Sequence, residues 1–437
     1  MTISDTKELS TRSAILLAAC SELQAFGPVG FRVSRVLESA NASFSSLYHH
    51  FEDREGLLRA ATVRMFQLSN RYDIAELARV TSEATTTTEF FNVIARQIFT
   101  IANDPALMQA RQERIAALAY GLSDPELLEA IVNAQKRGVS GLTSIFDLAK
   151  DRGLIRQDLN TESYVAWLLG ILLGHILVEI DPELGPRSST WDRCAILAAL
   201  QPLTPNREPL VWSSDWDFAM PREWEQPSTL IWGEAIPRSQ HPTAKLLIGN
   251  TIHILKNQGE KAVRIPLVLA DSGTSVTSIY HFFGDRAGLI AAAHAERFMQ
   301  LSPIAVVDYR ATTALARSAD DFFAFLRFNL IAHATEEAVV RWRWGRIEIL
   351  GSAIRNASLL ASISQSQRDV IDQIAAITSD GQSRGFISSE IMPHESAIWY
   401  IGMQMGRVLT EIQPGINTNE DWIDYAIEGI DAAFRCR

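Results

Sequence analysis

The chain has 437 residues, 47% of them hydrophobic, and a formal net charge of −11. This length exceeds a single ordinary core and predicts two or three domains, and the acidic balance argues against general binding of polyanions. Cys20, Cys194 and Cys436 lie far apart without a Cys-x-x-Cys pair, which predicts neither a disulfide framework nor a zinc site, so we expect no metal and no cofactor.

The first predicted elements are two helices. The chain opens without the basic region and apolar run of a secretion signal, so we expect a cytoplasmic protein. From Thr11 the apolar residues fall at helical spacing, which predicts a helix that Gly27 ends. Val33, Val36 and Leu37 predict a second, shorter helix. Both patterns occur again in the second part of the chain.

The segment from Ser43 to Leu57 recurs 232 residues later, from Ser275 to Leu289. The copies read SFSSLYHHFEDREGL and SVTSIYHFFGDRAGL, and nine of the fifteen positions are identical. A self-match at a fixed offset indicates a repeat. Each copy predicts a short helix, with the serine as a candidate N-cap, a break, and a further helix that begins at Asp53 or Asp285. With the preceding helices, this gives a helix-turn-helix unit with a supporting helix in front.

Both copies resemble the N-terminal DNA-binding segment of TetR-family transcriptional regulators. The residues that carry the resemblance are Ala40-Asn41-Ala42-Ser43, Leu47-Tyr48, Phe51, Arg54 and Leu57 in the first copy, and Ser272-Gly273-Thr274-Ser275, Ile279-Tyr280, Phe283, Arg286 and Leu289 in the second. The sequence departs from the family pattern at three places. Asn41 replaces a glycine, Arg54 and Arg286 replace a lysine, and Arg32 and Arg264 replace the threonine that opens the second helix.

The resemblance implies that each copy places one helix in the major groove of a double-stranded DNA operator. The expected DNA contacts are Ser43, Phe44, Ser45, Ser46, Tyr48, His49 and Arg54 in the first copy, and Ser275, Val276, Thr277, Ser278, Tyr280, His281 and Arg286 in the second. Two alternatives stay open. The tyrosines can serve the core, and the arginines can form ion pairs with Asp53 and Asp285. Catalysis has no support, because the Tyr-His pairs lack an acidic partner or a second metal ligand nearby in the sequence.

The remainder of each copy keeps a helical pattern, and matches at the 232-residue offset continue through it. Together with the resemblance, this predicts an all-α fold of two TetR-like units joined in one chain. Each unit has a helix-turn-helix domain, at 11–66 and 243–298, followed by a helical ligand and dimerisation lobe, at 67–200 and 299–437. We call residues 11–200 the first half and residues 243–437 the second half.

A segment of different composition, 201–242, separates the halves. Residues 201–241 hold six prolines, which argue against long helices, and the four tryptophans Trp212, Trp216, Trp224 and Trp232. Because flexible linkers are poor in aromatic residues, we expect an ordered strap that lies on one or both halves.

The most apolar segment, Tyr164 to Ile180, carries glycines four residues apart. Gly170 and Gly174 match Gly402 and Gly406 at the offset, and such glycines let two helix backbones approach closely. The segment is too short and too polar for a membrane span, so we expect no membrane contact. The resemblance places the subunit interface of TetR-type dimers here, which predicts an internal pseudo-dimer and a monomeric chain.

Candidate residues for an effector site lie in the lobes. They are Arg111, Trp167, Trp342, Arg346 and Trp399. The run from Arg341 to Arg346 alternates arginine and tryptophan, and it predicts either a pocket for an anionic ligand or arginines in solvent with tryptophans in the core. Trp167 and Trp399 match across the halves and favour packing over binding.

The predicted function is therefore a one-component transcriptional regulator, a repressor, that is not an enzyme. It would bind an imperfectly palindromic operator as a single-chain pseudo-dimer and respond to a small-molecule effector of unknown identity. The alternative is a ligand or protein sensor with this fold that has lost DNA binding, which the acidic balance favours. No phosphate loop, nucleophile–base pair or metal motif is visible in the sequence.

Overall fold

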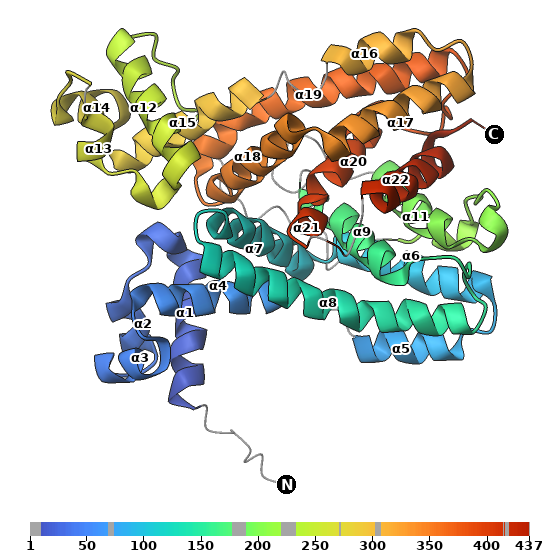
Figure 1. Ribbon diagram of the computed structural model, residues 1–437, viewed down its shortest axis with the longest axis horizontal. Helices are drawn as coiled ribbons and strands as arrows, with labels where there is room; N and C mark the ends of the chain where they lie inside the picture. The colour runs from blue at the N-terminus through green and yellow to red at the C-terminus, as the bar shows by residue number, and fades with distance from the viewer. Residues whose placement is uncertain are drawn as a thin grey trace.

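The computed structural model describes residues 10–68, 74–176, 189–219, 233–270, 272–301, 307–413, 415 and 419–436, which are mainly helical (Figure 1). Within these ranges the only β-type pairing is an isolated antiparallel bridge between Ile387 and Arg435. The predicted all-α fold is confirmed.

Ten α-helices are described in the first half. They are α1 (Thr11–Gly30), α2 (Val33–Ser39), α3 (Phe44–Phe51), α4 (Arg54–Leu68), α5 (Ile74–Glu83), α6 (Thr87–Asn103), α7 (Pro105–Gly121), α8 (Pro125–Asp151), α9 (Thr161–Leu173) and α11 (Ser189–Leu200). Gly27 has φ +65° inside α1 and marks the predicted break in that helix.

The second half repeats this order. Its described α-helices are α12 (Pro242–Gln258), α13 (Ile265–Leu269), α14 (Val276–Phe283), α15 (Arg286–Leu301), α16 (Val307–Ala314), α17 (Ala319–Thr335), α18 (Glu337–Ala353), α19 (Ala357–Ser383), α20 (Pro393–Gly406), α21 (Val408–Glu411) and α22 (Asn419–Phe434), and the 3₁₀ turn η6 (Glu260–Ala262) follows α12. Seven helices of the first half, α2–α4 and α6–α9, have a counterpart that begins 232 residues later. The offset found in the sequence thus also relates the helices.

The helices begin where the sequence provides caps. Thr86 and Glu89 form a reciprocal capping box at the start of α6. Asp104 and Asp124 accept hydrogen bonds from the first turns of α7 and α8, and each is followed by a proline at the first helical position. The Asp124 cap fixes the turn between α7 and α8, which matters for the contact between the halves.

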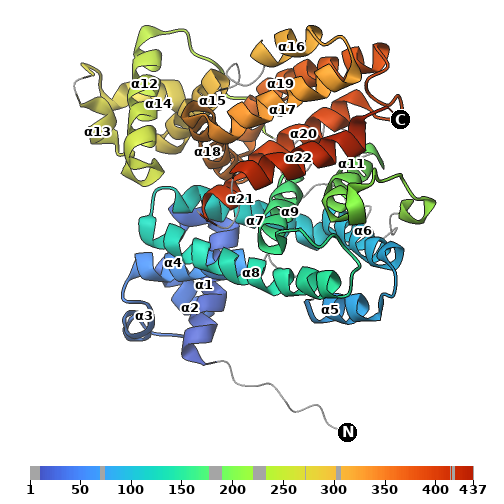
Figure 2. The same cartoon turned by 45° about the vertical axis from the view of Figure 1, so that its right-hand side comes forward.

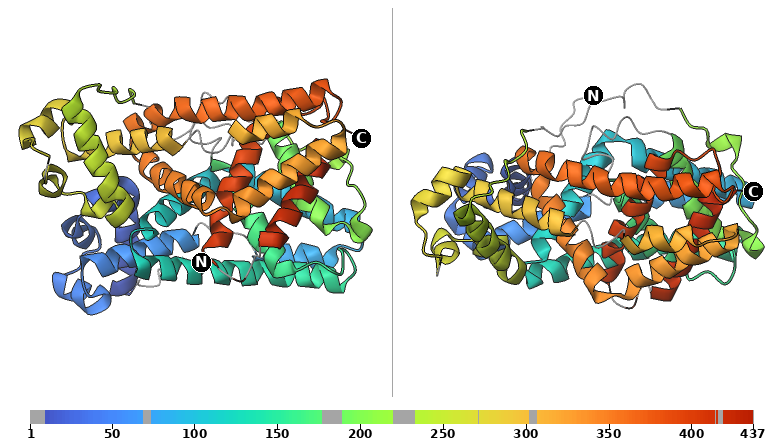
Figure 3. Two further views of the ribbon diagram at one scale, coloured as in Figure 1. Left: turned by 45° about the horizontal axis from the view of Figure 1, so that its top comes forward. Right: turned by 90° about the horizontal axis from the view of Figure 1, so that it is seen from above.

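Three hydrophobic cores organise the chain. One lies among α1–α4 and another among α12–α15, and we call these two helical groups the first head and the second head. The third core runs through both lobes without a break between the halves. The heads lie at the same end of the molecule, and the lobes form the rest (Figures 1 and 3).

The lobes meet in a bundle of four helices, two from each half: α9, α11, α20 and α22 (Figure 2). Gly170 lies against Gly406, and Gly174 lies against Gly402. A methyl group added to Gly170 would sit 2.9 Å from the Gly406 carbonyl oxygen, and one added to Gly402 would sit 2.7 Å from that of Gly174. Residues of the two halves therefore contact each other reciprocally, as they do in a two-fold interface.

The described parts of segment 201–242 lie on both halves. Trp216 donates from Nε1 to Asn92 Oδ1 at 2.8 Å on α6, where the Phe218 ring also packs 5.1 Å from that of Phe99. On the second half, the Ile236 amide donates to Ser362 Oγ of α19 at 2.8 Å. Trp224 and Trp232, which the sequence analysis counted toward the strap, lie outside the described residues.

Among the described helices, none combines the length and the continuous apolar sequence that crossing a lipid bilayer requires.

Candidate nucleic-acid interface

Helix α3 is held to the first head by one side and leaves the other side open. Leu47 and Phe51, four residues apart, are buried in the head core. Phe44 and Tyr48 point away from it and are 56% and 61% exposed. The Ser43 hydroxyl accepts a hydrogen bond from the Ser46 amide at 3.2 Å, so the predicted N-cap is confirmed.

Helix α14 presents the same arrangement in the second head. Ile279 is buried, while Val276 and Tyr280 are 43% and 56% exposed. Ser275 occupies the N-cap position, but its side chain accepts no hydrogen bond from the first turn, so its predicted capping role is wrong. The hydroxyl groups of Thr274 and Ser272, just before the helix, lie 2.9 Å from each other.

The other predicted contact residues lie on the same exposed sides. Those in solvent are Ser43, Ser45, His49, Ser275, Thr277 and His281, and those half-buried are Ser46 and Ser278. On each head, a hydroxyl-rich helix start is thus joined to an aromatic side chain one turn later. Such a surface has donors, acceptors and apolar groups within reach of phosphates and base edges.

Arg54 and Arg286 are half-buried and hydrogen-bond to backbone carbonyl groups of their own heads. Arg54 donates from Nη2 to the Pro28 carbonyl at 3.0 Å and pairs with Glu55. Arg286 donates to the Val263 carbonyl at 2.5 Å and to that of Glu260 at 3.1 Å. Both arginines therefore fix the connection between the first two helices of their head.

The alternative ion pairs with Asp53 and Asp285 do not form among the described residues. Each aspartate instead caps the helix that follows it. Asp53 Oδ1 accepts from the Gly56 amide at 2.7 Å, and Asp285 Oδ1 accepts from the Gly288 amide at 2.8 Å.

Each lobe contains a cavity at the corresponding place. The first is lined by Ile101, Leu107, Arg111, Arg114, Leu169, Leu172 and Leu173. The second is lined by His333, Trp342, Val370, Ile374, Tyr400, Ile401 and Gln404. Three lining positions correspond at the 232-residue offset: Leu169 remains aliphatic as Ile401, whereas Ile101 and Leu172 become the polar His333 and Gln404. Among the predicted effector residues, Arg111 and Trp342 line these cavities.

Arg346 is fully buried beside the second cavity. Its guanidinium group lies 4.2 Å from the Phe298 ring centroid and donates to Gln367, and burial lowers the pKa of Arg346 to about 9. The first half repeats this arrangement with Arg114, 4.9 Å from Phe66. The phenylalanine and glutamine partners were not predicted from the sequence, although both recur at the 232-residue offset.

A second buried arginine cluster surrounds Glu411. Arg343 Nε lies 3.1 Å and Arg407 Nε 3.3 Å from Glu411 Oε1. Both arginine side chains are almost wholly buried, and burial lowers the pKa of Arg407 to about 10. In the run from Arg341 to Arg346, the arginines at 343 and 346 therefore belong to the interior and only Arg341 reaches solvent.

Trp167 and Trp399 pack in the lobe interior and do not line either cavity. The Trp167 ring lies 5.9 Å from that of Tyr425, across the bundle, and the Trp399 ring lies 5.6 Å from that of Phe434. Both tryptophans are less than 2% exposed.

His333 makes the fold sensitive to acid. Burial, aided by the charges of Arg343 and Arg407, lowers the pKa of His333 to about 3 from 6.5. Below pH 6.5 the unfolded chain takes up a proton that the folded chain excludes until about pH 3, so stability falls as the pH falls. Between pH 7 and pH 5 we expect this residue to cost about 2 kcal/mol.

The measurement is denaturant unfolding at both pH values for the natural chain and for His333→Gln. The loss of unfolding free energy on acidification should be about 2 kcal/mol smaller in the variant. Equal losses in both proteins would contradict the assignment of a neutral, buried His333.

Within the described ranges, no group of three or more His, Cys, Asp or Glu side chains could hold a metal ion.

Comparison with known proteins identifies the first head. The sequence profile of the family described as "Bacterial regulatory proteins, tetR family" matches residues 15–61, which span α1 to α4. No curated protein matches the chain.

Three solved structures are similar. A protein from Mesorhizobium loti assigned as a TetR-family transcriptional regulator is 22% identical over 45% of this chain and 98% of its own, with a TM-score of 0.35. One from Rhodococcus sp. with the same assignment is 21% identical over 43% and 96%, with a TM-score of 0.32. A transcriptional regulator from Saccharomonospora viridis in complex with choline is 16% identical over 44% and 98%, with a TM-score of 0.34. Residues 15–61 of the chain are therefore a DNA-binding-type domain of the tetR family of bacterial regulatory proteins.

Proposed function

We propose that this protein is a transcriptional repressor that binds one DNA operator through both heads of a single chain. The observation that carries the proposal is the pair of corresponding exposed helix sides on α3 and α14, at the same end of the molecule. Exposed Tyr48 and Tyr280 have no role in the core, and a surface that leaves large aromatic side chains in solvent is typical of a binding site.

The single-chain arrangement is supported by the contacts between the halves. In a homodimer with two-fold symmetry, a residue i of one subunit contacts a residue j of the other, and the reverse contact also exists. Gly170 with Gly406 and Gly174 with Gly402 satisfy this condition within one chain. We therefore propose that the halves act as a pseudo-dimer, with one chain sufficient for an operator.

The operator should be an imperfect palindrome, because the two recognition helices differ. Phe44 corresponds to Val276 and Ser45 to Thr277, whereas Tyr48 corresponds to Tyr280. Contacts to a thymine methyl depend on the bulk of the apolar side chain, so related but unequal half-sites are expected.

An effector would act through the lobe cavities, which enclose only about 20 Å³ and about 10 Å³ and would have to widen to admit it. The two cavities differ in polarity, so we propose that they also differ in the ligand they accept. A small molecule that favours one arrangement of the lobes would shift operator affinity by linkage between the two sites.

A sensor without DNA binding is the second candidate, and a specific observation favours it. Arg54 and Arg286, the expected phosphate contacts, are engaged by carbonyl groups inside the heads. The heads also carry little net positive charge to attract a polyanion.

Duplex selection with the purified chain, followed by titration of the selected duplex, decides between the candidates. Tyr48→Ala and Tyr280→Ala should each weaken binding about tenfold or more, because each removes a contact at the DNA surface. Phe328→Ala is the matched control, since Phe328 is 62% exposed but lies on α17 in the lobe. Failure to select any duplex would favour the sensor, and equal effects of all three substitutions would exclude the proposed interface.

A further inference from the structure

The second head is joined directly to the first half by one lysine. Lys261, in the turn η6, lies with Nζ 2.9 Å from Glu55 Oε2 and 3.5 Å from Asp124 Oδ2. The same ammonium group lies 4.2 Å from the centroid of the Tyr120 ring. Glu55 is in the first turn of α4, and Asp124 caps α8, so the lysine contacts both the head and the lobe of the other half.

The backbone beside Lys261 also packs against the first half. Gly259 has φ +75°, and a methyl group added to it would collide with the Ser123 side chain in the turn before α8. On its other side the turn is tied to its own half, since Glu260 Oε2 lies 3.3 Å from His294 Nε2 in the second head and 3.0 Å from Ser352 Oγ in the second lobe. The turn thus links the second head, the second lobe and the first half.

This ionic contact exists on one side only. At the 232-residue offset, Val29 corresponds to Lys261, Ala287 to Glu55, and Asn356 to Asp124, and no ion pair can form among these residues. At the corresponding place on the first head, Arg355 of the second half approaches Gly27, with its Cδ 3.0 Å from the site of an added methyl group.

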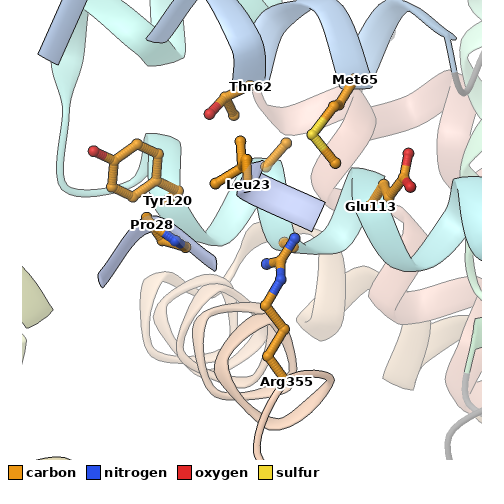
Figure 4. Close-up of a pocket in the computed structure, with 9 residues that line it drawn as sticks. Leu23, Pro28, Thr62, Met65, Glu113, Tyr120 and Arg355 are labelled. Atoms are coloured by element: carbon orange, nitrogen blue, oxygen red, sulfur yellow. The ribbon is translucent and has the colours of Figure 1, made fainter. Parts of the chain in front are cut away.

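Arg355 also lines a small cavity there with residues of α1, α4 and α7 (Figure 4). Figure 4 shows Leu23, Thr62 and Tyr120 around the same cavity. The first head therefore borders a small cavity at the place where the second head has the charged contact of Lys261.

We propose that Lys261 is a positioning residue for operator recognition, which fixes the separation and relative rotation of α3 and α14. The inference rests on the proposed function, in which both heads bind one duplex. Glu55 follows the end of α3 by four residues, so the contact lies close to the recognition helix of the other half. Moving one half-site by a base pair shifts it by about 3.4 Å and rotates it around the duplex, and rigidly held heads cannot follow.

The ion pair of Lys261 and Glu55 is partly exposed, so removing it should affect global stability little. The side chains of Lys261 and Glu55 are 39% and 37% exposed, and single ion pairs of this kind contribute little to global stability. Lys261→Ala should therefore leave the chain folded and release only the second head.

The first experiment measures affinity for the selected operator and for duplexes whose half-sites are moved by one or two base pairs. When the half-sites are moved by one base pair, the affinity of the natural chain for the duplex should fall about tenfold or more. The affinity of Lys261→Ala should fall less than about threefold. Lys261→Arg keeps the charge and should restore the narrow preference.

Lys256→Ala is the matched control. Lys256 lies on α12 of the same head, is exposed, and makes no hydrogen bond or ion pair within the described residues. Its loss removes the same charge near the DNA, so it should lower affinity at every spacing and leave the preference narrow. Identical spacing profiles for Lys256→Ala and Lys261→Ala would overturn the proposal.

A second experiment tests the contact without DNA. Spin labels are placed at His49→Cys and His281→Cys, both exposed, after Cys436→Ser removes the exposed native cysteine, since Cys20 and Cys194 are buried. The distance distribution between α3 and α14 should be narrow, and Lys261→Ala should widen it about twofold or more. An unchanged distribution would overturn the role of Lys261, whether or not the chain binds DNA. A widened distribution with no binding to any duplex would support the positioning role and contradict the proposed function.

Discussion

Replacing Gly406 by alanine is expected to lower the free energy of unfolding by about 2–3 kcal/mol or more. An added methyl group at this position would overlap the Gly170 carbonyl group on the facing helix α9. Backbone cannot rotate away as a side chain can, so α9 and α20 must separate along the whole contact. That separation opens the packing around neighbouring buried residues of the bundle.

Gly249→Ala provides the control. Gly249 lies within α12, and a methyl group added there would meet nothing within 4 Å. Alanine in a helix interior is favoured over glycine by about 1 kcal/mol, so this variant should be as stable as the natural chain or more so. Denaturant unfolding followed by circular dichroism compares the variants, and equal stability of Gly406→Ala and Gly249→Ala would contradict close contact in the bundle.

Glu411→Gln should be more damaging still, with a loss of about 3–5 kcal/mol. Glu411 is the only carboxylate paired with Arg343 or Arg407 in the described part of the chain, and both arginines are buried while Glu411 is only 12% exposed. Glutamine keeps the size of the side chain and removes the charge, which leaves two cations uncompensated in the lobe interior. Breaking such a group costs more than the ion pairs contribute, because the remaining charges stay away from water.

Glu337→Gln removes a carboxylate from an exposed pair on the same lobe. Glu337 and Arg341 are 83% and 65% exposed at an i, i+4 spacing on α18. Pairs of this kind contribute about 0.5 kcal/mol or less, so the midpoint of denaturation should hardly move. A comparable loss in both variants would show that Glu411 acts only as a surface charge.

The sequence was sufficient to predict the repeated architecture, because the determinants are local. Ser43 and the pair Leu47 and Phe51 define α3 through capping and helical spacing. The same spacing defines α14, and the glycines of α9 and α20 indicate a close approach of two helices. Short-range patterns of this kind can be recognised in the sequence without knowledge of the tertiary fold.

Contacts between residues far apart in the sequence could not be predicted from such local patterns. The arginine and tryptophan run of α18 was open to two interpretations, since nothing near Arg343 in the sequence indicates that its partner is Glu411. The ion pair of Lys261 with Glu55 joins residues 206 positions apart. The hydrogen bonds of Arg54 to backbone carbonyl groups were also missed, because these partners come from the connection before α2.

The most direct measurement for the account as a whole is the number of chains bound per operator duplex. Sedimentation of the complex with the selected duplex, at protein concentrations near the dissociation constant, should give one chain per duplex with both half-sites protected. Removing one half-site should weaken binding while the stoichiometry stays at one. Two chains on an intact duplex, or equal affinity for the duplex with a single half-site, would contradict recognition of one operator by both halves of a single chain.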